Sequence, residues 1–84
     1  MARLGLAIRY HPIFEEEALA LARRLFAQFD EAIDSLVLTP IGEDDFALFL
    51  NDQLVHSQRE SGSAPRVADV LETMGEEQWA TNDR

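Results

Sequence analysis

One periodic segment, from residue 14 to residue 29, constrains the fold more than any other feature of the sequence. Its apolar residues recur every three or four positions, the spacing of an amphipathic helix: Phe14, Ala18, Leu21, Ala22, Leu25 and Phe29. Short apolar segments flank this helix at residues 4–10 (LGLAIRY) and 36–39 (LVLT). A helix between two such strands predicts a right-handed βαβ unit with parallel strands.

The rest of the chain predicts a hairpin and a second helix. Residues 46–50 and 53–57 are apolar segments joined by Asn51-Asp52, two residue types that tolerate a positive φ and therefore favour a tight turn. A polar loop over residues 59–65 leads to a helix over residues 66–74, for which Gly75 is the predicted stop.

The predicted order β-α-β-β-β-α indicates an α/β protein, more specifically an α+β sandwich with a four-stranded mixed sheet and two helices. We expect residues 1–75 to form a single domain and residues 76–84 to form a flexible tail. The tail contains Trp79, for which two interpretations stay open: folding back onto the domain, or docking on a partner.

Composition excludes several classes of function. Sixteen Asp and Glu against seven Arg give the 84-residue chain a net charge of −9, which opposes binding to nucleic acid or to an anionic membrane. No apolar stretch approaches the ~20 residues of a membrane span, so we expect a cytoplasmic protein. The absence of cysteine excludes thiolate nucleophiles, cysteine-ligated metals and thiol–disulfide exchange by this chain alone.

Several motifs in this order resemble the selenoprotein W-like (Rdx) family over roughly residues 4–74. They are the first strand ending in Tyr10, the helix segment ALALARRLF (18–26), the strand LVLTP (36–40), the hairpin around Asn51-Asp52 and the segment RESG (59–62) before Pro65. The resemblance implies a thioredoxin-like fold.

The resemblance also implies where a redox site would lie. Members of the family carry Cys-x-x-Cys, or Cys-x-x-selenocysteine, directly after the tyrosine that ends the first strand. Here Tyr10 is followed by His11-Pro12-Ile13-Phe14, so neither reactive group is present. Without a thiol or selenol, this chain cannot carry out thiol–disulfide exchange. The sequence also departs from the family at His56, where an aromatic residue is common, and at Ala64, where phenylalanine usually precedes the proline.

The candidate binding residues are Tyr10, His11, Phe14 and Arg59. The carboxyl ends of parallel strands meet at one edge of a sheet, beside the start of the following helix, and the predicted topology brings these residues there with Thr39, Pro40 and Ser57. Phe14 has two interpretations: it fills the core beneath this edge, or it is exposed as an anchor for another protein.

Two functions from different classes follow. The first is a non-catalytic module that binds a protein partner through this edge, or associates with a second copy through strand 36–39 or strand 53–57 at a margin of the sheet. The alternative is a small-molecule or metal site, or a minor enzyme, that uses His11 as acid, base or ligand. In that case Tyr10 and Arg59 would orient the ligand, and Glu15 and His56 could join His11 on a metal. We assign no catalytic residue, cofactor or resident metal.

The three consecutive acids Glu15, Glu16 and Glu17 also have two interpretations. Their position in the first turn of the predicted helix complements the helix dipole, which is the simpler explanation. A cation site is the other.

Overall fold

The computed structural model describes residues 3–82, and the surroundings of the side chains of residues 3–74. The elements are β1 (Leu4–Tyr10), a short 3-10 helix (Pro12–Phe14), α1 (Glu15–Phe29), a second 3-10 helix (Asp30–Ala32), β2 (Ile33–Pro40), β3 (Phe46–Leu50), β4 (Gln53–Ser57), α2 (Gln58–Ser61) and α3 (Val67–Asn82). The predicted order of strands and long helices is confirmed, with the short α2 added. No helix in this part of the chain has both the length and the apolar character needed to span a membrane.

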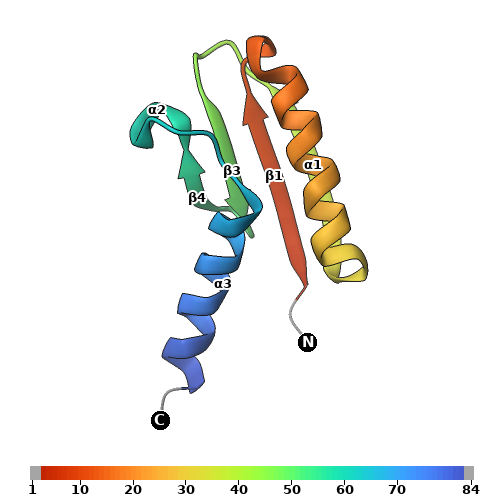
Figure 1. Cartoon of the computed structure of the whole chain (residues 1–84), viewed down its shortest axis with the longest axis vertical. Coiled ribbons are helices and arrows are strands. Elements are labelled where there is room, and N and C mark those ends of the chain that lie inside the picture. Colours follow the sequence, from red (N-terminus) through yellow and green to blue (C-terminus); the bar gives the residue numbers. More distant parts are fainter. Residues whose placement is uncertain (1–2, 83–84) are drawn as a thin grey trace.

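The four strands form one mixed sheet in the order β2-β1-β3-β4. β1 pairs with β2 in parallel, whereas β1–β3 and β3–β4 are antiparallel. Figure 1 shows α1 and α3 side by side on the same face of this sheet. The predicted two-layer α+β architecture is therefore confirmed, and both β2 and β4 lie at margins of the sheet, as predicted.

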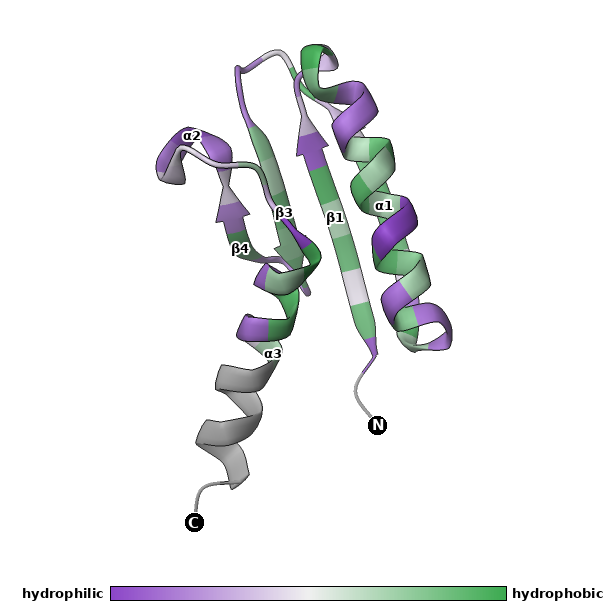
Figure 2. Cartoon of the chain, viewed as in Figure 1, coloured by the Kyte–Doolittle hydropathy of each residue, from purple (hydrophilic) through white to green (hydrophobic). Residues whose placement is uncertain are grey.

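The core lies between the sheet and the two helices. Alternate residues of β1 and β3 point into it, because successive side chains of a strand face opposite sides. Figure 2 shows the resulting apolar character along β1 and β3, the two central strands. The buried cluster consists of Leu4, Leu6, Ile8, Ala18, Leu21, Ala22, Leu25, Phe46, Leu48, Leu50 and Val70.

The opposite face of the sheet is not covered by any helix of the described chain. It carries a shallow hollow of about 380 Å³ lined by Ala7, Arg9, Val37, Thr39, Phe49 and Asp52. The guanidinium carbon of Arg9 lies 5.6 Å from the centre of the Phe49 ring, a cation–π contact that covers part of this apolar face.

The predicted hairpin turn is confirmed. Asn51 and Asp52 have φ angles of 51° and 69°, the left-handed conformation that a two-residue turn requires. The turn also fastens the neighbouring strand, because the Asn51 side-chain oxygen accepts a hydrogen bond from the Gly5 amide at 2.9 Å.

Three differences from the sequence prediction extend over more than one residue. β2 begins at Ile33 rather than at Leu36, because Ile33 packs on the core and pairs with Leu4 although polar residues follow it. α2 replaces part of the predicted loop: it ends at Ser61 and is capped by Gly62, whose φ of +86° suits glycine.

The third difference concerns Gly75, which was predicted to end the last helix. The helix instead continues through this residue to Asn82. A glycine inside a helix costs only about 1 kcal/mol, and it ends a helix where the chain turns to a positive φ. The Trp79 side chain lies outside the described residues, and the flexible tail stays a prediction.

Candidate functional site

The predicted convergence at the end of β1 is present in the structure except for Thr39, which lies on the uncovered face of the sheet. Tyr10 lies between Pro40 of β2 and Phe46 of β3. The backbone amide of His11, the next residue, donates a hydrogen bond to the Asp45 carbonyl at 3.0 Å. The end of β1 is thus held by both of its neighbours, and the start of the helical layer follows directly.

His11 begins the 3-10 helix that leads into α1. Its Nδ1 accepts a hydrogen bond from the Ile13 amide at 3.2 Å, as an N-cap residue does. The half-buried imidazole therefore has a local structural role, and Nε2 is the ring nitrogen left for any ligand. Within the described residues, His11, Glu15 and His56 do not form a group of three or more ligands that could hold a metal ion.

Phe14 is half-buried and packs on the core rather than standing free. Its ring stacks on that of Phe46, with a centroid separation of 5.7 Å and an interplanar angle of 25°. Offset stacking of this kind contributes about 0.5–1.5 kcal/mol beyond the burial of the two rings. Of the two interpretations of Phe14, the structure supports the one in which it fills the core beneath the edge.

Asp45 connects the remaining elements at this edge, and the sequence did not single it out. Its carboxylate accepts hydrogen bonds from the Phe46 amide at 2.7 Å, from Ser57 Oγ at 3.0 Å and from the Arg59 amide at 3.0 Å. The residue before β3 thereby holds the end of β4 and the start of α2.

Burial tends to raise the pKa of Asp45. The hydrogen bonds from the two amides and from Ser57 outweigh it together with the positive charge of Arg59, so the pKa lies below its ordinary value. Asp45 is therefore ionised in the folded protein at neutral pH. The Arg59 side chain itself is exposed and adds charge at this edge.

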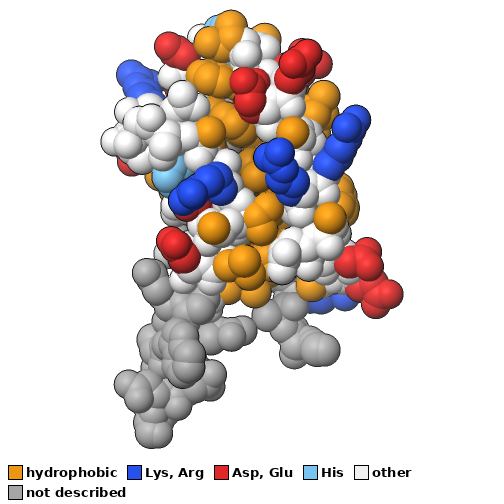
Figure 3. All heavy atoms as spheres, viewed as in Figure 1, with side chains coloured by type: hydrophobic (Ala, Val, Ile, Leu, Met, Phe, Trp, Pro, Cys, Tyr) orange, Lys and Arg blue, Asp and Glu red, His pale blue; other side chains and the backbone are white. Residues whose placement is uncertain are grey.

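A groove runs beside Phe46, between α1 and the loop that precedes α3. It has a volume of about 440 Å³ and is lined by Glu16, Glu17, Ala20, Leu21, Arg24, Phe46, Ala64, Pro65 and Arg66. Figure 3 shows an apolar stripe between the two helices, with acidic side chains near one end and basic side chains farther along. The sequence did not predict this groove, because its walls come from segments far apart in the chain.

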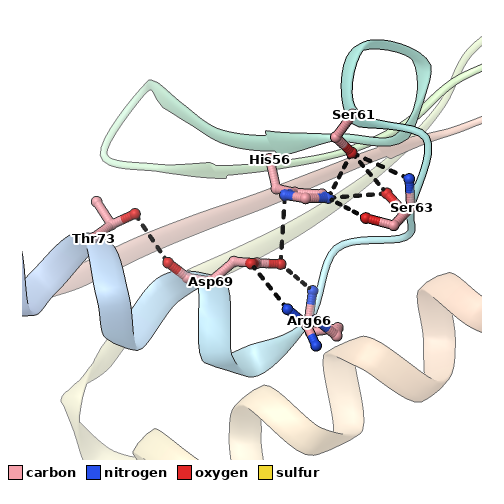
Figure 4. Close-up of polar contacts among 6 residues, drawn as sticks. All are labelled: His56, Ser61, Ser63, Arg66, Asp69 and Thr73. Carbon is pink, nitrogen blue, oxygen red and sulfur yellow. Dashed lines mark hydrogen bonds and ion pairs between the residues drawn. The ribbon is translucent and has the colours of Figure 1, made fainter.

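A second polar cluster surrounds His56, where the loop after α2 meets the start of α3 (Figure 4). The His56 Nε2 lies 2.9 Å from the Ser63 carbonyl oxygen and 2.8 Å from Ser61 Oγ, and Nδ1 lies 3.7 Å from Asp69 Oδ2. The serine–histidine–aspartate order has the outline of a hydrolase triad.

Its hydrogen bonds nevertheless indicate a structural role. A carbonyl oxygen only accepts, so Nε2 carries the proton that it donates to Ser63 and cannot take one from Ser61. The Asp69 carboxylate accepts a hydrogen bond from the Arg66 amide at 2.7 Å, as a helix-start contact, and 3.7 Å is too long for a hydrogen bond to His56. His56 thereby fastens the loop to β4, and Asp69 caps the start of α3.

We expect the substitution His56→Ala to lower the free energy of unfolding by about 1–2 kcal/mol, because it removes one of the two donors to the Ser63 carbonyl, the other being Ser61 Oγ, together with the packing of a half-buried ring. Urea denaturation measures the change. Gln53→Ala, at an exposed position of the same strand, is the matched control and should change stability by less than about 0.5 kcal/mol. Equal stability of the His56 variant and the wild type would contradict the structural role.

Comparison with solved structures confirms the thioredoxin-like fold. A selenoprotein W-related protein from Vibrio cholerae superposes with a TM-score of 0.75 and 19% identity, covering 83% of this chain and 90% of that one. A protein from Bordetella parapertussis superposes with a TM-score of 0.77 and 17% identity, covering 89% of this chain and 98% of that one. No curated protein matches the chain.

Sequence identities this low show a shared fold but not a shared family. The family assignment therefore rests on the comparison with family models. The Rdx family model matches residues 10–76, which is most of the sequence and includes both long helices in whole or in part. The positions after Tyr10 hold no cysteine, and no cysteine occurs elsewhere in the chain. With the fold, the match and the predicted motif order in agreement, the chain belongs to the Rdx family.

Proposed function

We propose that this chain is a non-redox member of the Rdx family that binds a polypeptide segment in the groove between α1 and the loop before α3. The observation that carries the proposal is the groove itself, which combines an apolar floor with acidic side chains near one end and basic side chains farther along. Ligand sites are usually concave and apolar, with a few charged groups that fix orientation.

The floor of the groove consists of buried side chains. Leu21, Phe46 and Pro65 are buried, and Phe46 is supported from behind by the stacked ring of Phe14. A preformed floor reduces the entropy that is lost when a segment binds. Phe14, at one of the two positions where the family resemblance places a redox group, thereby contributes to the proposed site as packing rather than as chemistry.

The separated acidic and basic side chains indicate the kind of segment that fits. Glu16 and Glu17 lie in the first turn of α1, whereas Arg24 lies further along the same helix and Arg66 lies across the groove from it. The Arg66 guanidinium approaches Asp69 only to 3.8 Å and its side chain is 71% exposed, so it is accessible to a ligand. We therefore expect a segment with an apolar centre, a basic residue towards Glu16 and an acidic residue towards Arg66.

Selection from a displayed library of random peptides tests this proposal. The enriched peptides should share an apolar centre flanked by unlike charges. A purified peptide of this kind should bind the Ala64→Phe variant about tenfold more weakly or worse, because the new ring fills the groove. Ala32→Phe, at an exposed position beyond the end of α1 and outside the groove, is the matched control and should bind like the wild type.

A charge variant separates the two parts of the recognition. Arg66→Glu should weaken peptides with an acidic end and spare peptides in which that residue is replaced by glutamine. Failure to enrich any peptide, or equal binding to the wild type and to Ala64→Phe, would overturn the proposal.

A further inference from the structure

We infer that two copies of this chain associate through the outer edge of β2, in an antiparallel pairing whose two-fold axis passes beside Val37. The predicted self-association thereby gains a particular surface and register. This surface lies on the other side of α1 from the proposed peptide groove, so either can fail without the other.

The hydrogen-bonding groups on the free side of β2 can be identified from its pairing with β1. Tyr10 pairs with Pro40, and the Ile41 amide donates to the Tyr10 carbonyl at 2.9 Å. Backbone groups of successive residues in a strand point to alternate sides. Residues 37, 39 and 41 therefore face β1, whereas Leu36 and Leu38 direct their N–H and C=O groups outward, where no strand of the described chain pairs with them.

The middle of this edge, residues 35–39, lacks the features that usually prevent strand pairing, and the register shift of β2 at Asp34 lies before it. Natural edge strands are commonly protected by charged side chains, prolines or bulges. Residues 35–39 contain no charged residue and no proline. Asp34, just before them, is paired with Arg3 at 3.1 Å, and Pro40 stands only at the end of the strand.

Apolar side chains flank the edge on both faces of the sheet. Val37 is 52% exposed on the uncovered face. On the helical face, the residues of α1 that turn towards α3 line the groove, among them Ala20 and Arg24. At 100° per residue, Leu19 and Phe26 fall on the opposite flank of α1, towards the β2 side, and they are 41% and 51% exposed.

A second copy of the chain would pair the outward backbone groups of β2 and also cover the exposed apolar side chains beside it. In the antiparallel register through Val37, Leu36 lies opposite the partner's Leu38 and the two exchange both of their N–H···O bonds. The two Val37 side chains meet on the uncovered face, and a two-fold axis perpendicular to the sheet keeps both α1 helices on one side, with their exposed Leu19 and Phe26 flanks turned towards the junction.

Charge and the lone proline also suit this register. Asp34 lies opposite the partner's Pro40, so the pairing brings no like charges face to face despite the net charge of −9. The missing amide of Pro40 falls at the margin of the junction rather than at its centre.

Sedimentation equilibrium over a wide concentration range tests the inference. The wild type should show a reversible monomer–dimer equilibrium. Val37→Lys should weaken the dimer by about tenfold or more, because it places two lysines directly opposite each other. Leu54→Lys is the matched control: Leu54 is 44% exposed on β4, at the other margin of the sheet, and this variant should dimerise like the wild type.

Phe26→Ser provides an independent variant on the helix, where no strand pairing is disturbed, and should weaken the dimer several-fold. Circular dichroism shows whether each variant is folded. If Val37→Lys does not fold, Phe26→Ser alone tests the proposed dimer. A wild type that remains monomeric throughout, a dimer unaffected by Phe26→Ser, or equal weakening by Val37→Lys and Leu54→Lys would each overturn the inference.

Discussion

Replacing Phe46 by alanine should lower the free energy of unfolding by about 3–5 kcal/mol, a large part of the stability of a domain of this size. The Phe46 ring is 1% exposed and stacks on Phe14 at 5.7 Å. Its removal leaves a cavity in the core and deprives Phe14 of its partner. Urea denaturation followed by circular dichroism measures the loss.

Phe49→Ala is the matched control for this prediction. Phe49 lies on the same strand as Phe46, but its half-buried ring is on the uncovered face, where it contacts Arg9. We expect it to cost about 1–2 kcal/mol, for partial burial and a cation–π contact. Similar losses for the two variants would mean that the core does not lie where the structure places it.

The Phe14–Phe46 stack also explains how a member of the Rdx family can retain the fold without its redox groups. In the family resemblance, Phe14 occupies the second of the two reactive positions. Here the same position packs on the core and supports the floor of the groove. Phe14 therefore stabilises the fold at this position by its burial in the core. The function that we propose depends on the groove, whose floor this packing supports.

The order and type of the long elements were predictable from the sequence because each depends on local periodicity. The apolar spacing of α1, the β1 and β3 segments and the Asn51-Asp52 turn are all features of neighbouring residues. The prediction that the last helix ends at Gly75 was wrong because the residue type alone does not determine φ. A glycine ends a helix where its φ is positive and continues the helix where its φ is helical.

The site was less predictable because it is assembled from residues far apart in the sequence. Glu43, Asp44 and Asp45 are three consecutive acids with no local feature that distinguishes them. Only the fold brings the Ser57 hydroxyl and the Arg59 amide to one of them. The groove has the same origin, since α1 and the loop at Pro65 are far apart in the sequence and only the fold brings them together.

The substitution Asp45→Ala should lower the free energy of unfolding by about 2–4 kcal/mol. Hydrogen bonds to a charged carboxylate are strong, and removing the carboxylate leaves their donors unpaired. Those donors are the Phe46 amide, the Ser57 hydroxyl and the Arg59 amide. The loss should be localised: amide hydrogen exchange should accelerate at Phe46 and Arg59 more than in the centre of α1. Uniform acceleration across the chain would contradict a local role.

The Asp45 carboxylate also makes the free energy of unfolding depend on pH, with lower stability in acid. Hydrogen bonds hold the pKa of Asp45 in the folded state below its ordinary value of 3.8, so the folded state binds this proton less readily than the unfolded chain does. The stabilisation is therefore complete above about pH 5 and is lost as the pH falls through 4 towards the folded pKa. Asp45→Asn keeps the shape without the charge, so its stability should fall below that of the wild type at neutral pH and converge with it in acid.

Other carboxylates contribute to the acid profile of both proteins, so the informative quantity is the difference between the two stability curves. Asp44→Asn, at the exposed neighbouring position, is the matched control, and its curve should run parallel to that of the wild type. If the gap between Asp45→Asn and the wild type were the same at pH 7 and at pH 3, the Asp45 carboxylate would not be held by these hydrogen bonds. A gap that closes in acid for Asp45 and not for Asp44 would identify Asp45 as the charge that fastens β4 and α2 to the start of β3.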